Sequence, residues 1–281
     1  MKVKALQKLR QKLKKNKPIY GLWVTLESAS ITEMAVSLGP DWVVIDAEHG
    51  YLDWKDINSH ISAALRSDTV VLVRIVERST ILSKRALDIG ADGIIIPWME
   101  KVEEVEEAVQ DCRYPPEGRR GIGGERATVW GQCLSEHANE ANENVLVIPL
   151  IENINAIPNV ANMCKVDGID IFFFGPADFS ASAGFRVQWE GPGVAEQILE
   201  LKDIINAAGK HCGVISTSVQ NLTERRDQGF RMLALGTDSG LLMRSLHQSL
   251  QKVDRDRLPA TSLDPADGRA LSGSDAGENN T

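Results

Sequence analysis

Eight short apolar runs, separated by helical patterns, constrain the fold of this chain more than any other feature of its sequence. The runs span residues 20–26, 42–46, 70–75, 93–97, 145–151, 169–174, 212–216 and 232–235. Most of them are continuously apolar rather than alternating, which is typical of strands buried on both faces of a parallel sheet. Eight strand–helix units within about 240 residues predict an α/β fold of the (β/α)8 TIM-barrel type.

The segments between these runs support the same fold. Helices are expected over residues 31–38, 56–65, 80–89, 101–112, 194–208 and 222–228. Several of them run into a glycine just before the next strand, as helix C-termini commonly do, at Gly39, Gly90, Gly209 and Gly229. The main rival is a doubly wound dinucleotide-binding sheet, but no Gly-x-Gly-x-x-Gly sequence follows the first run.

The segments outside this repeat lead to three further expectations. Residues 1–17 carry eight cations and no acid, and Leu6, Leu9 and Leu13 recur at helical spacing. This segment is either a membrane-surface or RNA-binding arm or an amphipathic helix packed on the barrel, and we favour the packed helix. The interval from 97 to 145 is longer than one helix and two loops need, so we expect an irregular insertion. Residues 259–281 are rich in Ser, Asp, Gly and Asn and predict a disordered tail, which leaves one barrel domain over residues 1–258.

Composition narrows the classes of function. The chain of 281 residues has a net charge of −8, which argues against nucleic acid as the main partner. It has no apolar run of about 18 residues that would span a membrane, and its N-terminus lacks the apolar core of a secretory signal. Four scattered cysteines without CxxC spacing suggest neither a disulfide framework nor a thiolate metal site. We therefore expect a cytoplasmic protein with neither nucleic acid nor a membrane as partner.

Candidate catalytic residues follow the predicted strands, where the active sites of TIM barrels lie. His49 comes three residues after Asp46, which could hold its imidazole as a base, although a bond to a loop carbonyl is equally ordinary. Arg74 ends a buried run and needs an anionic partner, either an internal acid or a substrate carboxylate. Glu152 and Asp178 could share a hard cation such as Mg²⁺ or Mn²⁺, or could instead cap helices and pair with arginines.

The sequence lacks the residues that two other kinds of catalysis require. A Schiff-base aldolase needs a lysine near a strand mouth in a desolvated pocket, but none of the predicted strands ends in lysine. A serine or cysteine nucleophile finds no elbow motif. The sequence therefore favours acid–base or metal-assisted chemistry at the mouth.

Several motifs, in the right order, resemble the HpcH/HpaI aldolases, the class II pyruvate aldolases. The matching segments are residues 21–24, 41–49, 73–74, 87–91, 95–97, 114–121, 151–153, 174–180 and 234–238. The resemblance covers roughly residues 5–250. Each segment alone is a weak signal, whereas their order along the chain makes the resemblance specific.

The resemblance implies an assembly, a reaction and a cofactor. The barrel would exchange its last helix between partners in a homo-hexamer built as a trimer of dimers. The reaction would be the reversible retro-aldol cleavage of a 4-hydroxy-2-oxo acid to pyruvate and an aldehyde. A divalent metal, Mg²⁺, Mn²⁺ or Co²⁺, would be held by Glu152 and Asp178.

The resemblance also implies roles for the other mouth residues. Arg74 would bind the carboxylate of pyruvate or its enolate. His49, oriented by Asp46, would act on a metal-bound water or on the aldol hydroxyl. The remaining implied contacts are Trp23 at the pyruvate end, backbone near Ala177 at the carboxylate, and Glu48 at metal-bound waters.

Departures from the family pattern leave alternatives open. Leu150 stands two residues before the metal-binding Glu152, where family members often have Gln, and Glu125 stands where an apolar or small residue is usual. The same enolate chemistry would serve an oxaloacetate decarboxylase or a relative of macrophomate synthase. More distant alternatives are an acyl-CoA lyase resembling the citrate lyase β subunit and an inactive barrel that serves in binding or assembly.

Overall fold

The computed structural model describes residues 1–186, 188–255, 257–258 and 269–270. The chain divides after Thr237 into two units, residues 1–237 and residues 238–281. The first unit contains the barrel. The second contains the helix α11 (Asp238–Gln251) and a two-stranded pair, β9 (Arg257–Leu258) with β10 (Arg269–Ala270). The predicted tail falls outside the described residues except at 269–270, and the predicted domain boundary at residue 258 stays a prediction.

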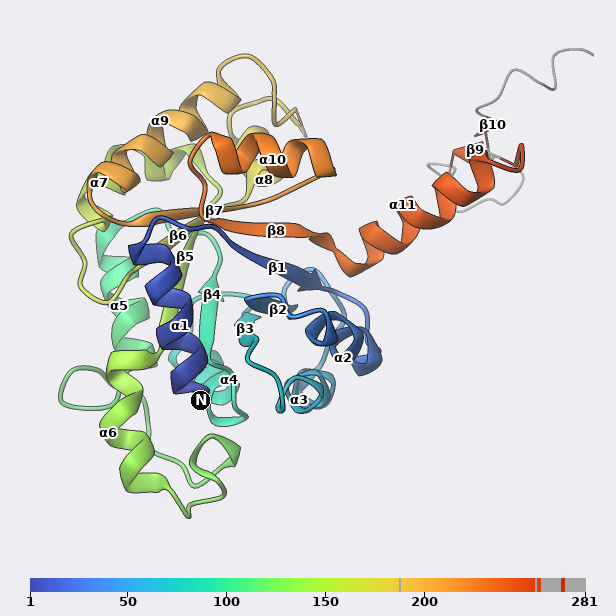
Figure 1. Ribbon diagram of the computed structural model, residues 1–281. Coiled ribbons are helices and arrows are strands. Elements are labelled where there is room, and N and C mark those ends of the chain that lie inside the picture. The colour runs from blue at the N-terminus through green and yellow to red at the C-terminus, as the bar shows by residue number, and fades with distance from the viewer. Residues whose placement is uncertain (187, 256, 259–268, 271–281) are drawn as a thin grey trace, which may run out of the picture. The chain divides into compact units, whose positions relative to one another are not determined.

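Parallel strands of the first unit close into a barrel in which each strand pairs with the next and β8 pairs with β1 (Figure 1). The strands are β1 (Ile19–Val24), β2 (Trp42–Asp46), β3 (Val70–Arg74), β4 (Gly93–Ile96), β5 (Leu146–Ile151), β6 (Ile171–Phe174), β7 (His211–Ile215) and β8 (Met232–Thr237). Each one overlaps a predicted apolar run. The predicted TIM barrel is confirmed.

Helices follow the strands on the outside of the barrel. They include α2 (Ala29–Ser37), α3 (Trp54–Ala63), α4 (Thr80–Asp88), α5 (Val102–Cys112), α7 (Val160–Met163), α8 (Pro176–Ser182), α9 (Val194–Ala207) and α10 (Val219–Asp227). Asp53 caps α3 by accepting hydrogen bonds from the N–H groups of Lys55 and Asp56, so a local sequence signal fixes where this helix begins. The helices α7 and α8 were not predicted, because segments of four and seven residues are too short to show a helical period.

The long interval after β4 is more helical than the sequence predicts. It contains α5, a short 3-10 turn η1 (Arg126–Thr128) and the helix α6 (Leu134–Asn144). The helix α6 is rich in asparagine and buries only Ala141 and Asn144. Because this segment has no apolar stripe, its sequence does not predict a helix. The expectation of an irregular insertion is therefore wrong for residues 134–144.

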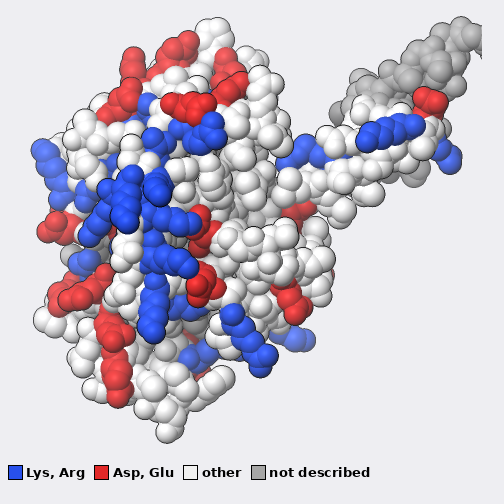
Figure 2. Space-filling view, in the orientation of Figure 1, with Lys and Arg blue, Asp and Glu red and all other residues white. Residues whose placement is uncertain are grey.

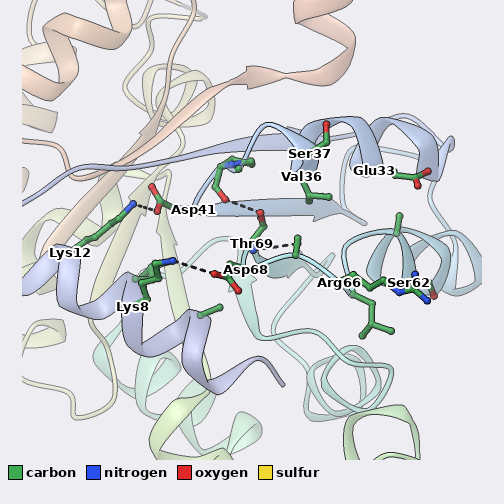
Figure 3. Close-up of a pocket in the computed structure, with 17 residues that line it drawn as sticks. Lys8, Lys12, Glu33, Val36, Ser37, Asp41, Ser62, Arg66, Asp68 and Thr69 are labelled. Atoms are coloured by element: carbon green, nitrogen blue, oxygen red, sulfur yellow. Dashed lines mark hydrogen bonds and ion pairs between the residues drawn. The ribbon is translucent and has the colours of Figure 1, made fainter.

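The basic N-terminal segment forms the helix α1 (Val3–Lys14), whose leucines Leu6, Leu9 and Leu13 are buried with the side chains that fill the barrel. Lys12 pairs with Asp41 and Lys8 pairs with Asp68, acids that precede β2 and β3 (Figure 3). The cations of α1 gather in a band over this helix (Figure 2). The expected packed amphipathic helix is confirmed, and it covers the amino-terminal end of the barrel.

The interior of the barrel is solid rather than open. A Cβ atom at Gly21 would lie 2.1 Å from the ring of Trp42, and one at Gly213 would lie 2.3 Å from the ring of Phe173. Only glycine leaves room at these two positions for the large aromatic side chains. A ligand therefore cannot pass through the barrel and must bind at one of its ends. Within the described residues, no helix combines the length and the apolar character that a membrane crossing requires.

Candidate active site at the carboxyl ends of the strands

A hollow of about 290 Å³ lies at the carboxyl ends of the strands. The predicted residues that line it are Trp23, Asp46, His49, Arg74, Glu152, Ala177 and Asp178. A larger hollow, of about 1040 Å³, lies at the other end of the barrel between α1, α2 and α3 (Figure 3). Lysines, acids and serines line that larger space, and each of its labelled lysines reaches an acid. The smaller hollow is the candidate active site, because it gathers the buried charged groups.

Arg74 is the centre of the charged part of the hollow. Its Nε donates to Oδ1 of Asp46 at 2.9 Å, and its Nη2 donates to Oδ2 of the same carboxylate. Its Nη1 lies 2.8 Å from Oε2 of Glu48, and its guanidinium stands 5.0 Å from the ring centre of Trp23. The arginine is only 7% exposed. The two acids and the indole therefore hold the Arg74 guanidinium in place at the mouth. Glu48 pairs with it from just outside the lining of the hollow.

The carboxylate of Asp46 accepts two hydrogen bonds from Arg74. Burial by itself would raise the pKa of Asp46, but the hydrogen bonds and charge of Arg74, the Glu48 N–H and the Trp23 indole together hold it below its usual value. Asp46 also accepts a hydrogen bond from the backbone N–H of His49, at 3.3 Å. Its contact with His49 therefore runs through the backbone, and the orienting of the imidazole by Asp46 stays a prediction. The His49 side chain itself is exposed at the mouth.

Glu152 is a buried carboxylate with a raised pKa. Its Oε1 accepts a hydrogen bond from the Trp98 N–H at 2.8 Å. Burial, together with the negative charges of Glu48 and Asp178, raises the pKa of Glu152 to about 8, although the Trp98 bond and Arg74 act in the opposite direction. Gly175 makes this position possible, because a Cβ atom there would lie 2.7 Å from Oε2 of Glu152.

Trp98 has a backbone conformation that the sequence does not reveal. Its φ of 56° is in the left-handed region, which non-glycine residues seldom occupy. This conformation accompanies the hydrogen bond from its N–H to Glu152. Strained backbone of this kind is concentrated at functional sites. No local sequence pattern specifies this conformation, so only the folded structure shows the hydrogen bond from Trp98 to Glu152.

The donor set fits a hard divalent cation. The described residues contain no cluster of three or more His, Cys, Asp or Glu side chains arranged around one point. Glu152 and Asp178 line the same hollow, and two carboxylates leave room for the waters and substrate oxygens that Mg²⁺ and Mn²⁺ take as further ligands. A pKa near 8 means that Arg74 compensates the charge of the Glu152 carboxylate only in part, and a bound cation would supply the remaining positive charge.

Comparison with known proteins identifies the family of this chain. The family model described as HpcH/HpaI aldolase/citrate lyase matches residues 19–245. The chain belongs to the HpcH/HpaI family. This HpcH/HpaI protein is 32% identical over 240 residues to a hydroxypyruvate/pyruvate aldolase from Roseobacter denitrificans, covering 85% of this chain and 93% of that one. It is 35% identical to a 4-hydroxy-2-oxovalerate aldolase from Rhodococcus jostii, covering 79% of this chain and 86% of that one.

A solved structure shares the whole barrel with this HpcH/HpaI protein. It is a family member described as HpcH/HpaI aldolase/citrate lyase from Burkholderia cenocepacia. The two chains superpose with a TM-score of 0.84 at 32% identity, over 88% of this chain and 98% of that one. The predicted family resemblance is confirmed.

Proposed function

We propose that this chain is a carbon–carbon lyase, a class II pyruvate aldolase that cleaves a 4-hydroxy-2-oxo acid reversibly to pyruvate and an aldehyde. The observation that carries the proposal is Arg74, a buried guanidinium fixed by Asp46 and Glu48 at the wall of a hollow that also holds Glu152 and Asp178. The relatives named pyruvate and 4-hydroxy-2-oxovalerate aldolases support the same reaction class.

Arg74 would bind the carboxylate of the 2-oxo acid. A guanidinium carries five N–H donors, of which Asp46 engages two and Glu48 faces a third nitrogen. Donors therefore remain for a ligand, and the fixed arginine does not have to be ordered when the ligand binds. Trp23, at 5.0 Å from the guanidinium, would line the pyruvate end, and backbone near Ala177 would contact the carboxylate.

Glu152 and Asp178 would hold a divalent cation, Mg²⁺, Mn²⁺ or Co²⁺. The bound metal would stabilise the negative charge that develops on the enolate oxygen as the carbon–carbon bond breaks. Glu48, whose pKa is raised mainly by burial, would accept hydrogen bonds from waters at this position. His49 would take the proton of the aldol hydroxyl, because its exposed imidazole lines the same hollow and an imidazole can act as a general base.

The proposal is tested by pyruvate release. The purified chain is incubated with 4-hydroxy-2-oxo acids and with oxaloacetate, in each case with Mn²⁺ and with EDTA. The expected result is pyruvate from a 4-hydroxy-2-oxo acid that stops on chelation and returns with added metal. Cleavage that survives chelation would contradict the metal mechanism. Activity on oxaloacetate alone would favour a decarboxylase.

We also propose a homo-hexamer, a trimer of dimers, in the cytoplasm, with one domain over residues 1–258. The helix α11 supports an assembly role, because it carries several exposed apolar side chains, Leu241, Leu242, Met243, Leu246 and Leu250. Light scattering coupled to size-exclusion chromatography tests the assembly. A monomer at micromolar concentration would contradict it.

A further inference from the structure

The wall of the mouth combines charged side chains with apolar ones, of which Leu150, Phe173 and Phe174 lie on β5 and β6. The charged groups come from β2, β3, β5 and the start of α8, at Asp46, Arg74, Glu152 and Asp178. On the side of β7, Ile215 takes part in the lining, together with Trp189 from the loop between α8 and α9. Neither has a role in binding pyruvate or metal in the proposed reaction. This apolar side is where the carbon chain of the aldehyde can lie.

Trp189 separates the mouth from a second space. Its side chain lines both the mouth and a gap of about 10 Å³, which Pro176, Ile198, Val214 and Phe230 also line. That gap is about the size of a single water molecule. The indole therefore forms part of a partition between the hollow and the packed layer behind it, together with Pro176 and Ile215, which also line both spaces. Loss of the ring would extend the mouth towards α9 and β7.

The partition is held from outside the mouth. Glu190, the next residue, pairs with Arg225 of α10, and Arg225 also donates to Oε1 of Gln228 at 2.8 Å. Within the described residues, Nε1 of Trp189 is buried and has no hydrogen-bond partner. Packing and the neighbouring ion pair thus fix the ring, without a hydrogen bond of its own. A phenylalanine at 189 would keep an aromatic wall, whereas an alanine would remove it.

We propose that Trp189 is the residue that determines specificity for the size of the aldehyde, and that it restricts the enzyme to 4-hydroxy-2-oxo acids with a short substituent on C4. The inference rests on the proposed aldolase function. The hollow of about 290 Å³ must hold pyruvate and the aldehyde together. That volume is at the small end of ligand pockets, which run from about 300 to 1,000 Å³.

The test measures aldol addition of pyruvate to straight-chain aldehydes from acetaldehyde to hexanal, with Mn²⁺ present. In the unchanged chain, kcat/KM is expected to fall by about tenfold or more along the series, because an extra methylene that a pocket excludes costs about that factor. In Trp189→Ala, kcat/KM falls only a few-fold along the series, because KM for the long aldehydes is lower. The KM for pyruvate stays the same, and Trp189→Phe keeps the original profile.

The matched control is Phe185→Ala, which removes a partly exposed aromatic side chain from the same loop outside the lining of the mouth, and its profile stays unchanged. An unchanged profile in a folded Trp189→Ala protein overturns the proposal. If circular dichroism shows that this variant is unfolded, Trp189→Leu takes its place under the same criterion. If the unchanged chain forms no aldol product with any aldehyde, the proposed function fails instead, which is a distinguishable result.

Discussion

The two ends of the barrel both carry ion pairs, but they differ in how deeply those pairs are buried. At the end covered by α1, the side chains of Lys8 and Asp68 are 65% and 86% exposed. At the mouth, those of Arg74 and Asp46 are 8% and 2% exposed. Exposed pairs contribute about 0–1 kcal/mol to stability. The charges of α1 therefore add little, and its buried leucines hold that end of the molecule together.

At the mouth, burial makes the charges costly. Transfer of these charges out of water costs desolvation free energy, and their mutual attraction offsets that cost only if every group keeps its partner. The raised pKa of Glu152 shows that the attraction does not fully offset the desolvation cost for this carboxylate. A protein selected for stability alone would fill such a space with apolar side chains, so the charges at the mouth indicate ligand binding. The following variants test this difference between the two ends.

Glu152→Ala is expected to have the largest effect. It removes a carboxylate that we assign to the metal, so Mn²⁺ binding measured by calorimetry should weaken by more than the roughly 100-fold that loss of an outer-shell partner costs. Pyruvate release should become undetectable. The melting temperature should change little, because removal of an uncompensated buried acid offsets loss of the hydrogen bond from the Trp98 N–H. Unchanged metal affinity would show that the ligand assignment is wrong.

His49→Ala is expected to separate chemistry from binding. Loss of a general base lowers the rate by about 10²–10⁴-fold, so kcat should fall by that factor. Mn²⁺ affinity should stay within about twofold, because an exposed imidazole contributes little to a site of two carboxylates. Titrations of Mn²⁺ into His49→Ala and into Glu152→Ala, run in parallel, compare the metal affinities of the two variants. A loss of metal affinity equal to that of Glu152→Ala would place His49 among the metal ligands.

Arg74→Ala tests the buried charges directly. Removal of the guanidinium leaves Asp46 without its main partner, and breaking a buried pair in this way costs about 3–5 kcal/mol. Denaturant unfolding measures the loss. The double variant Arg74→Met/Asp46→Leu should recover much of the stability but no activity. A loss of less than about 1 kcal/mol in Arg74→Ala would mean that the mouth is as tolerant as the surface.

A pair of variants in α1 tests the other end, with the smallest expected effects on activity. Leu6→Ala removes a fully buried side chain and should cost about 2–5 kcal/mol. Lys8→Ala, on the same helix, should cost about 1 kcal/mol or less, because its pair with Asp68 is exposed. Unfolding curves give both values, and kcat per folded molecule should be unchanged in each. Equal losses would contradict the assignment of stability to the leucines.

Much of the fold was predictable because its signals are local and repeated. The continuous apolar runs mark buried parallel strands, whereas the start of α3 was expected at residue 56 and lies at Trp54, just after the Asp53 cap. The helix α6 was not predicted because it lies over the barrel with almost no apolar stripe. Its formation depends on the tertiary contacts of the surrounding segment, which no short window of sequence contains.

The candidate site was predictable in its membership but not in its geometry. Strand ends bring Asp46, Arg74 and Glu152 together in any barrel of this order, so their residue types could be assigned to one mouth. The pairing of Asp46 with Arg74 rather than with the His49 imidazole depends on side-chain directions. The placement of Trp189 depends on a loop with no periodic pattern. Both are consequences of packing that sequence spacing does not encode.

The pairing of β1 with β8 also determines when the barrel can close during synthesis. The strand β1 cannot pair with β8 until residues 232–237 have left the ribosome, more than two hundred residues after β1 itself. Until then the seam stays open, and the leucines of α1 have no complete barrel end to cover. Exposed strand edges and apolar surface are the features of nascent chains that aggregate. The nascent chain is therefore expected to be most prone to aggregation just before its last strand emerges.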